Sequence, residues 1–567
     1  MTTLPHFDEE KRDERLEELR KREEEDLGKM RSGKYNIPFI DLSGVSIEGD
    51  ALRLIPETRA RSAGMAAFQA IGKKLYIAVI SPGKKEMKIV LSELESKGYI
   101  PFLYMASNAS LGRAWGRYKD ISQSFESRSG ILDISTEFLG EIVEKIKNVK
   151  DIRETVEDVM KGSKSHKISA MLEIILAGAI AVDASDVHVE PEEEKVRLRF
   201  RLDGVLDTIM SLDFDTYKLL ESRIKLISGL KLNVKDSAQD GRFSIKISGT
   251  EIEIRTSVLP GSYGESFVLR LLNPKSISVP FESLGIDTRL LKIIEREIRK
   301  PNGIILTTGP TGSGKTTTLY AVLKKIYDPG TKIITIEDPI EYHLPGITQT
   351  QVEEKKGYTF AGGLRSVLRQ DPDVIMVGEI RDGETATTAI NAALTGHLVF
   401  STLHTNNAAG TIPRLIDLGI NPKIISSALN ISLAQRLVRK LCEICKKEDS
   451  PNKEEEAVIV STLARIKKES KNYALEEIGK NSTGEKIWRA VGCEKRNGTG
   501  YKGRIGIYEG IVADENIEKI MITNPSEREI KKAAESQSLL DMAEDGVVKV
   551  LKGITSLEEL ERVVEME

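Results

Sequence analysis

The sequence contains little cysteine and no long apolar run. Only three cysteines occur among 567 residues, and this small, odd number points to a reducing compartment. No signal peptide opens the chain, which also predicts a cytoplasmic location. The longest apolar stretch, residues 171–182, includes Glu173 and is far shorter than the roughly 20 residues that a membrane-spanning helix needs. We therefore expect any contact with a membrane to be peripheral.

An excess of positive charge is missing too. The net charge is −4, so the chain as a whole has no attraction for nucleic acid or for an anionic membrane surface. No basic strip with interleaved aromatic residues is found, and we expect no direct contact with nucleic acid. Hydrophobic residues make up 40% and charged residues 30%, as is usual in soluble globular proteins. The length predicts about three or four domains.

What the sequence does contain is a phosphate-binding loop. The stretch GPTGSGKTTTLY, residues 309–320, fits the pattern G-x-x-x-x-G-K-[ST]. An apolar run before it predicts a buried strand, and residues 319–323 predict a helix after it, so that backbone N–H groups and a helix N-terminus face the phosphates. Lys315 is expected to reach the β- and γ-phosphates, and the Thr316 hydroxyl to bind Mg²⁺. The loop residues expected to contact the nucleotide are Gly309, Thr311, Gly312, Ser313, Gly314, Lys315, Thr316 and Thr317.

Acidic side chains follow the next predicted strand, residues 333–336. Glu337, Asp338 and Glu341 cluster at its carboxyl end, where ligands bind in open α/β sheets. Carboxylates at this position can hold Mg²⁺ or orient a water molecule. Asp338, next to Pro339, could at the same time cap a helix.

Two further strands continue this pattern. Residues 374–377 are apolar and precede Glu379, which occupies the metal-facing place of a Walker-B-like strand. Residues 396–408 predict a third strand, with His397 and His404 at its two ends. Histidines are often structural, so a nucleotide sensor and a structural role are both open for this pair.

Before the nucleotide-binding region, a charged N-terminal arm is followed by a region with the pattern of strands and a helix. Residues 7–32 are dominated by charged residues, with Glu17 and Lys21 at the helical spacing i,i+4. A solvated helix is the simpler interpretation of this arm, and a docking arm for a partner is the alternative. Strands are expected over residues 37–42 and 73–82, and a helix over 85–99.

A second unit carries several arginines on its strands. Val196, Leu198 and Phe200 alternate with arginines, as in a half-buried hairpin strand. A second hairpin is expected to turn at Ser248-Gly249-Thr250. The predicted parts of the chain are a charged helical N-terminal arm (1–34), a first N-terminal domain (35–106), a connector (107–160), a second N-terminal, arginine-bearing domain (161–272), a hinge (273–285) and a nucleotide-binding domain (286–567) with a cysteine-containing segment (442–504).

The motifs together resemble those of the secretion ATPase superfamily, and most of all the group that powers type IV pilus assembly and type II secretion. TIEDPIEY is similar to its Asp box, RQDPDVIMVGEIRD to its Walker B motif and TGHLVFSTLHTN to its His box. ASDVHVEP, RFRLDGVL, QDGR and GESFVLRLL resemble its second N-terminal domain, and AQRLVRKLC and GTGYKGRIGIYE also fit. The resemblance covers about residues 165–567 and extends more weakly to 35–106. Because the retraction-motor branch lacks that first domain and the cysteine segment, the chain resembles an assembly or secretion motor.

The resemblance implies an α/β fold, with a RecA-like P-loop NTPase domain preceded by an α+β second N-terminal domain and a small α/β first one. It implies a hexameric ring that hydrolyses ATP with Mg²⁺ at the cytoplasmic face of the inner membrane. Its expected partners are a membrane platform protein and pilin-like or pseudopilin subunits. The competing hypotheses are a nucleic-acid translocating or packaging ATPase, a small-molecule kinase and a scaffold that does not hydrolyse nucleotide.

The resemblance also suggests catalytic roles. Arg242 and Arg255, in QDGR and EIRTS, lie where the family has nucleotide-facing arginines, although they could instead pair with nearby carboxylates. Glu341 is expected to activate the attacking water, and Glu379 to serve the metal because its strand is expected next to the P-loop strand. The reverse assignment of the two glutamates stays open. His404 is also expected to be a catalytic residue. Glu337 and His397 are expected to contact the nucleotide.

The sequence departs from the family at a metal site. Family members often carry two CxxC pairs that bind zinc, which usually takes four Cys or His ligands. Here Cys442 and Cys445 form one pair, but Cys493 is followed by Arg496 in the fourth ligand place. Asp449 or Glu494 could substitute, and a zinc-free remnant held by packing is the alternative. The R-L-G motif with which some relatives bind cyclic di-GMP is missing, so that ligand is not predicted.

Overall fold

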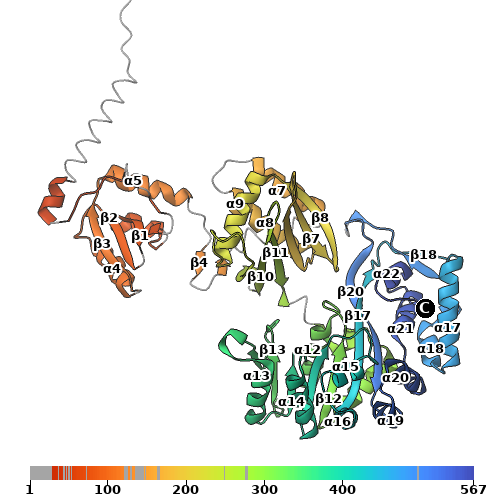
Figure 1. The fold of residues 1–567 in the computed structure, drawn as a ribbon. Helices are drawn as coiled ribbons and strands as arrows, with labels where there is room; N and C mark the ends of the chain where they lie inside the picture. The colour runs from red at the N-terminus through yellow and green to blue at the C-terminus, as the bar shows by residue number, and fades with distance from the viewer. Residues whose placement is uncertain are drawn as a thin grey trace, which may run out of the picture. The chain divides into compact units, whose positions relative to one another are not determined.

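The protein is described here by a computed structural model. The structure describes residues 29–35, 37–42, 45, 47–48, 51–52, 54–71, 73–96, 98–120, 125–127, 131–133, 146, 148–161, 167–247, 250–274, 279–494 and 497–566. The expectations for most of the charged arm, for the Ser248-Gly249 turn and for Arg496 lie outside these residues. The chain forms two compact units, Met1–Phe125 with Val159–Met171, and Glu126–Asp158 with Leu172–Glu567 (Figure 1). Among the described residues, no helix is long and apolar enough to cross a membrane.

The first unit contains a small three-stranded sheet in the order β1-β2-β3. β1 and β2 are antiparallel, and β2 and β3 are parallel. The predicted helix after β2 is confirmed, and it buries Met87, Val90 and Leu94, which share one helical face. The strand expected over residues 37–42 is wrong, because only a single bridge from Phe39 to Met105 forms there. The elements are α3 (Glu57–Ala63), β1 (Met65–Ile71), β2 (Lys74–Val79), α4 (Lys85–Ser96), β3 (Ile100–Met105) and α5 (Asn108–Gly116).

The second unit begins with an eight-stranded sheet in the order β4-β5-β9-β10-β11-β6-β7-β8. The predicted alternation on β7 is observed, since Val196, Leu198 and Phe200 are buried. β9 and β10 are antiparallel, and their register places Arg242 opposite Arg255. Phe125 and residues 159–171, which include the end of α7 and the start of α8, fall in the first unit. The elements from β4 onward are β4 (Phe125–Ser127), β5 (Ile131–Asp133), α7 (Val149–Lys161), α8 (Lys167–Ala181), β6 (Asp186–Pro191), β7 (Val196–Leu202), β8 (Val205–Leu212), α9 (Phe214–Ile227), β9 (Gln239–Ile247), β10 (Thr250–Gly261) and β11 (Gly264–Leu272).

The nucleotide-binding region is built on a seven-stranded sheet in the order β14-β13-β15-β16-β12-β17-β20. The first six strands are parallel, and β20 is antiparallel at the edge. The parallel P-loop sheet confirms the predicted fold class. The strands are β12 (Gly303–Thr308), β13 (Ile333–Glu337), β14 (Thr348–Gln351), β15 (Val374–Val377), β16 (Leu398–Leu403), β17 (Leu429–Leu441) and β20 (Tyr501–Val512).

This strand order corrects one expectation. β16 lies between β12 and β15, so the strand that ends before Glu379 is not the neighbour of the P-loop strand. The sequence predicted the strands one by one, but the lateral order depends on how the crossover helices connect them.

Helices cover both faces of this sheet, which explains why its central strands are apolar throughout. Neighbouring residues of β12 join different cores: Ile304 and Leu306 pack with α14, whereas Ile305 packs with α11 and α12. A third core holds the C-terminal helices against the end of β17. The helices are α11 (Thr288–Glu297), α12 (Lys315–Ile326), α13 (Phe360–Val367), α14 (Gly383–Leu394), α15 (Thr411–Asp417), α16 (Pro422–Ala428), α17 (Lys453–Lys468), α18 (Asn472–Ile478), α19 (Glu515–Thr523), α20 (Glu527–Ala534), α21 (Met542–Leu551) and α22 (Leu557–Glu561).

Candidate nucleotide site

The phosphate loop connects the end of β12 to the start of α12, as its sequence predicts. Gly309, Gly312 and Gly314 have φ values of 148°, 81° and 92°, a region that side chains other than glycine rarely adopt. A Cβ atom on Gly309 would lie 2.6 Å from the Gln435 carbonyl oxygen and from Ser313 Oγ. This position therefore requires glycine for its space as well as for its backbone angle.

Lys315 lies at the first position of α12 and faces back over the loop. Its Nζ donates to the carbonyl oxygens of Gly309, at 2.7 Å, and Pro310, at 3.2 Å. Burial lowers the pKa of Lys315, and the nearby Glu379 carboxylate opposes that shift. No ion pair of Lys315 is found within the described residues. The ammonium group is thus held by neutral acceptors that phosphate oxygens can replace.

Glu379, the predicted Walker-B glutamate, lies close to the phosphate loop and to Lys315. Its Oε1 lies 2.5 Å from Arg381 Nη2, and its Oε2 lies 3.3 Å from His404 Nε2. The contact with Glu379 raises the pKa of Arg381. The structure therefore gathers Lys315, Glu379 and His404 at the carboxyl ends of the strands. Arg381 was missed by the sequence analysis, although its place two residues after Glu379 was a usable signal.

The second predicted glutamate, Glu341, has a different partner. Its Oε2 accepts a hydrogen bond from Arg255 Nη1 at 2.8 Å, and Arg255 Nη2 donates to the Ile340 carbonyl oxygen at 2.6 Å. Arg255 Nε also donates to Glu253, at 3.2 Å. A cleft of about 800 Å³ opens here, and Arg242 lines it. Arg255 thus pairs with carboxylates, the alternative left open above, and one of them is the predicted base.

Two predicted nucleotide contacts lie elsewhere. His397 precedes β16 and lies beside Gly303 at the start of β12, whereas the phosphate loop follows the other end of β12. Its Nδ1 lies 3.1 Å from the Ala392 carbonyl oxygen. Glu337 is only 3% exposed and its carboxylate receives hydrogen bonds from Tyr320, Thr335 and Gln349. Both placements argue against a direct contact with nucleotide.

The helix cap suggested for Asp338 is not formed either. β13 ends at Glu337, and residues 338–345 form bends and turns without a helix. The Asp338-Pro339 peptide bond is cis. Glu341 therefore lies on an irregular segment that follows β13.

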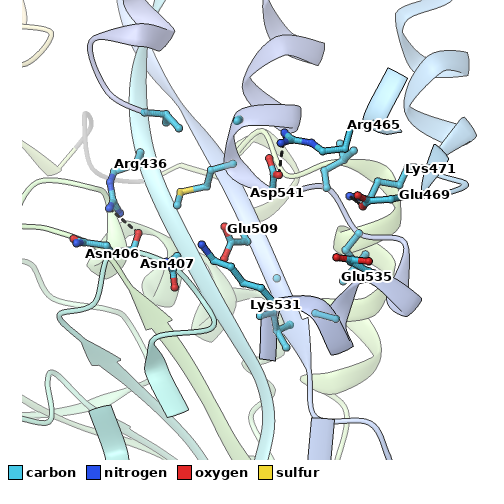
Figure 2. Close-up of a pocket in the computed structure, with 18 of the residues that line it drawn as sticks. Asn406, Asn407, Arg436, Arg465, Glu469, Lys471, Glu509, Lys531, Glu535 and Asp541 are labelled. Atoms are coloured by element: carbon cyan, nitrogen blue, oxygen red, sulfur yellow. Dashed lines mark hydrogen bonds and ion pairs between the residues drawn. The ribbon is translucent and has the colours of Figure 1, made fainter. Parts of the chain in front are cut away.

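Two residues of β17 lie next to the phosphate loop. Gln435 Nε2 donates to the Ser313 carbonyl oxygen at 2.7 Å, and its Oε1 is buried without a partner. Arg436 Nη2 donates to the Asn406 carbonyl oxygen at 2.7 Å (Figure 2). Gln435 bonds to the loop from 122 positions downstream, and a Cβ atom on Gly309 would lie 3.1 Å from Arg436 Nη1. Nothing local in the sequence pointed to either residue.

Arg436 also borders a pocket of about 650 Å³ (Figure 2). Many of the charged side chains that line this pocket form ion pairs with one another or with a buried neighbouring residue. Arg465 contacts Asp541 and Glu544, and Lys471 contacts Glu469 and Glu544. Burial raises the pKa of Glu509, which accepts a hydrogen bond from the Ala408 backbone at 2.8 Å. Arg436 lines this pocket, and no residue of the fully described phosphate loop does.

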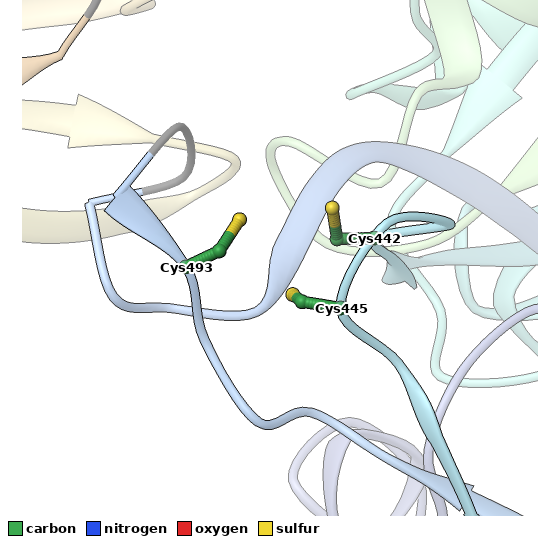
Figure 3. A group of neighbouring side chains, drawn as sticks. All are labelled: Cys442, Cys445 and Cys493. Carbon is green, nitrogen blue, oxygen red and sulfur yellow. The ribbon is translucent and has the colours of Figure 1, made fainter.

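The three cysteines come together, as their spacing suggested (Figure 3). Their sulfur atoms all lie within 4.8 Å of one another, and Cys442 is buried. Burial raises the pKa of Cys445 to about 11, and hydrogen bonds with Cys493 and Cys442 add to the rise. The group offers three of the four ligands of a structural zinc site. The predicted fourth position, Arg496, lies outside the described residues.

The residues around the loop suit a nucleotide with its metal. The glycine backbone, the N-terminus of α12 and Lys315 supply positive potential for phosphate oxygens. Thr316 and Glu379 supply oxygen ligands of the kind that Mg²⁺ prefers. Because Arg381 and His404 already hold the Glu379 oxygens, Glu379 suits a contact through a metal-bound water better than direct ligation.

Comparison with known proteins places this arrangement in context. A family model described as Type II/IV secretion system protein matches residues 161–562. The chain is 37% identical to the type IV pilus assembly ATPase PilB of Myxococcus xanthus over 539 residues, which cover 95% of this chain and 91% of that protein. It is 45% identical to the type II secretion system protein E of Aeromonas hydrophila over 407 residues, covering 72% and 77%. The solved structure of the Legionella pneumophila ATPase DotB matches with a TM-score of 0.49 and 22% identity, covering 69% of this chain and 95% of that one.

Proposed function

The chain belongs to the family of type II/IV secretion system proteins and is an ATP hydrolase, and from this premise we propose that it is the motor of type IV pilus assembly or type II secretion. It works as a hexamer at the cytoplasmic face of the inner membrane. It acts through a membrane platform protein on pilin-like or pseudopilin subunits. The single observation that carries this proposal is the match to the PilB relative over 95% of the chain, with the phosphate loop and Glu379 in place.

The loop residues bind and orient the ATP phosphates in this proposal. Lys315 exchanges its two carbonyl acceptors for oxygens of the β- and γ-phosphates. Thr316 would hold Mg²⁺ directly and Glu379 through its water shell, and the ion would supply positive charge to those oxygens. His404 fixes the Glu379 carboxylate through the contact at 3.3 Å.

Glu341 acts as the general base. It takes a proton from a water molecule whose oxygen attacks the γ-phosphorus, while the bond to the β,γ-bridging oxygen breaks and ADP leaves. Arg255, and Arg242 opposite it on β9, stabilise charge on the transferring phosphoryl group. The pair of Arg255 with Glu341 must separate before either can do so, which ties hydrolysis to a rearrangement of the protein.

The experiment that tests this function compares wild type with Lys315→Ala in steady-state ATP hydrolysis. The variant should lose turnover and bind ATP more weakly, because the charge on the β- and γ-phosphates is lost. Lys325→Ala, on the same helix but paired with Glu282 at 2.5 Å, is the matched control and should retain turnover. Wild-type turnover in Lys315→Ala would refute the assignment of the loop.

The hexamer is tested in the same assay. Turnover per chain should fall on dilution as the mass measured by light scattering falls from that of a hexamer toward that of one chain. Constant turnover per chain down to the monomer would contradict a site that needs several subunits. A nucleic-acid motor, the other candidate, predicts that added DNA or RNA stimulates turnover, and the net charge of −4 argues against it.

A further inference from the structure

A buried cluster of polar side chains lies on the face of the sheet that packs against α12. Glu337, at the end of β13, accepts hydrogen bonds from the Tyr320 hydroxyl, from Thr335 Oγ1 at 2.5 Å and from Gln349 Nε2 at 3.0 Å. Within the described residues, Glu337 forms no ion pair with a Lys, Arg or His side chain. Burial raises the pKa of Glu337, and the three donors oppose that shift. A buried carboxylate of this kind is costly unless its oxygens are fully hydrogen-bonded.

The cluster connects two parts of the nucleotide site. Tyr320 belongs to α12, the helix that begins with Lys315 at the phosphate loop. Burial raises the pKa of Tyr320, and the Glu337 carboxylate, which accepts a hydrogen bond from its hydroxyl, adds to the rise. The hydroxyl thus links the phosphate-loop helix to the end of β13, four residues before the residue proposed as the base.

Gln349 of β14 completes the connection from the other side. Its Nε2 lies 3.1 Å from the Tyr342 carbonyl oxygen and 3.3 Å from the Tyr320 hydroxyl. Its Oε1 accepts a hydrogen bond from the Leu344 backbone at 2.7 Å. The Tyr342 ring packs edge-on against Tyr320, with the ring centres 4.7 Å apart. Residues 338–344 form no helix or strand. The side-chain contacts of Gln349 and Tyr320 therefore hold this segment where backbone hydrogen bonds of a regular element do not.

We infer that Tyr320, Glu337 and Gln349 form a positioning network that holds the segment carrying Glu341 in register with the phosphate-loop helix. The three residues do not touch the nucleotide. They act through Glu341, so this inference rests on the proposed role of Glu341 as the base. Displacing a catalytic group by about 1 Å can cost on the order of 100-fold in rate, and a fixed carboxylate at the end of β13 prevents such a displacement.

The test uses Tyr320→Phe, which removes one hydroxyl and keeps the ring that packs on Tyr342. Turnover (kcat) should fall about tenfold, while the affinity for a fluorescent ATP analogue stays within about twofold of wild type. Glu337→Gln should behave in the same way. Because a direct nucleotide contact would weaken affinity, parallel losses of affinity and kcat would overturn the inference.

Tyr508→Phe is the matched control. Its hydroxyl is also buried and lies 3.3 Å from Thr318 Oγ1 on the same helix, but it does not contact residues 338–344. This variant should lower the melting temperature as Tyr320→Phe does and leave kcat near wild type. If Tyr320→Phe also keeps its kcat within twofold of wild type while its melting temperature falls, the network is only structural and the inference is wrong.

Glu341→Gln separates this inference from the proposed function. If Glu341→Gln hydrolyses ATP at the wild-type rate, the assignment of the base fails, and the positioning role fails with it. If Glu341→Gln is inactive and Tyr320→Phe is unaffected, only the positioning role fails. In the double variant the loss should not exceed that of Glu341→Gln alone, because the network acts through this residue.

Discussion

Replacing Arg255 by Ala tests which of two effects of this arginine dominates. The side chain pairs with Glu341 at 2.8 Å, with 24% of the arginine and 34% of the glutamate exposed. If Arg255 only keeps Glu341 in an ion pair and so unavailable as the general base, removing Arg255 frees Glu341 and raises turnover. If Arg255 also stabilises charge on the transferring phosphoryl group, its loss lowers turnover.

The magnitudes decide between the two effects. A partly exposed ion pair contributes about 0.2–1 kcal/mol, so freeing Glu341 speeds the reaction at most about fivefold. An arginine that stabilises the transition state of phosphoryl transfer contributes roughly 10³–10⁵ in rate, or about 4–7 kcal/mol. We therefore expect kcat of Arg255→Ala to fall at least about 200-fold, with ATP affinity mostly kept.

The assay is steady-state phosphate release at saturating ATP, with binding of a fluorescent analogue measured separately. Arg197→Ala is the matched control, because Arg197 lies in the same sheet and pairs with Glu192 at 2.7 Å at similar exposure. An Arg255→Ala enzyme with unchanged or higher kcat would refute the transition-state role and leave the ion pair as the only function of this arginine.

Two further variants follow from the geometry of single carboxylates. Glu379→Gln should require more Mg²⁺ for half-maximal turnover at fixed ATP. The reason is that the variant lacks the carboxylate charge that Arg381 and His404 hold toward the loop. An unchanged Mg²⁺ titration would exclude a role of Glu379 in the metal's water shell. Asp287 caps α11, and burial raises its pKa to about 6, with Asp545 adding to the rise and the Leu290 backbone opposing it. The folded state thus binds a proton more tightly than the unfolded chain, so this group's contribution to stability falls as pH rises from about 4 to 6, by about 3 kcal/mol. Asp287→Asn keeps the cap and should remove that fall in urea titrations; equal pH profiles of the two proteins would contradict the shift.

The phosphate loop and the ends of its neighbouring strands could be predicted because their signals are local. Spaced glycines, a lysine and an apolar run fix a strand, a loop and a helix within about 25 residues. The hairpin strand β7 could be predicted for the same reason, since its alternation shows residue by residue.

The lateral order of the strands and the direction of single side chains could not be predicted in this way. Glu337 ends β13 beside two other acidic residues, yet it lies on the same strand face as Thr335 and turns toward Tyr320. Side chains two residues apart share a strand face, so the pairing with Thr335 was a signal that the acidic cluster obscured. Gln435 and Arg436 meet the loop only because β17 lies beside β12, a fact that no local pattern contains.

The distribution of the candidate catalytic groups bears on how hydrolysis could produce movement. Lys315 begins α12 just after the loop that follows β12, and Glu379 and His404 follow β15 and β16, so buried strands of one parallel sheet position all three residues. Glu341 lies on an irregular segment and is paired with Arg255, which belongs to the other sheet. A site that needs both sets must therefore exchange the Arg255–Glu341 contact for contacts with the phosphates during each turnover. Under the proposed function, that exchange moves one sheet relative to the other once per ATP, which is the kind of step a motor acting on a protein partner requires.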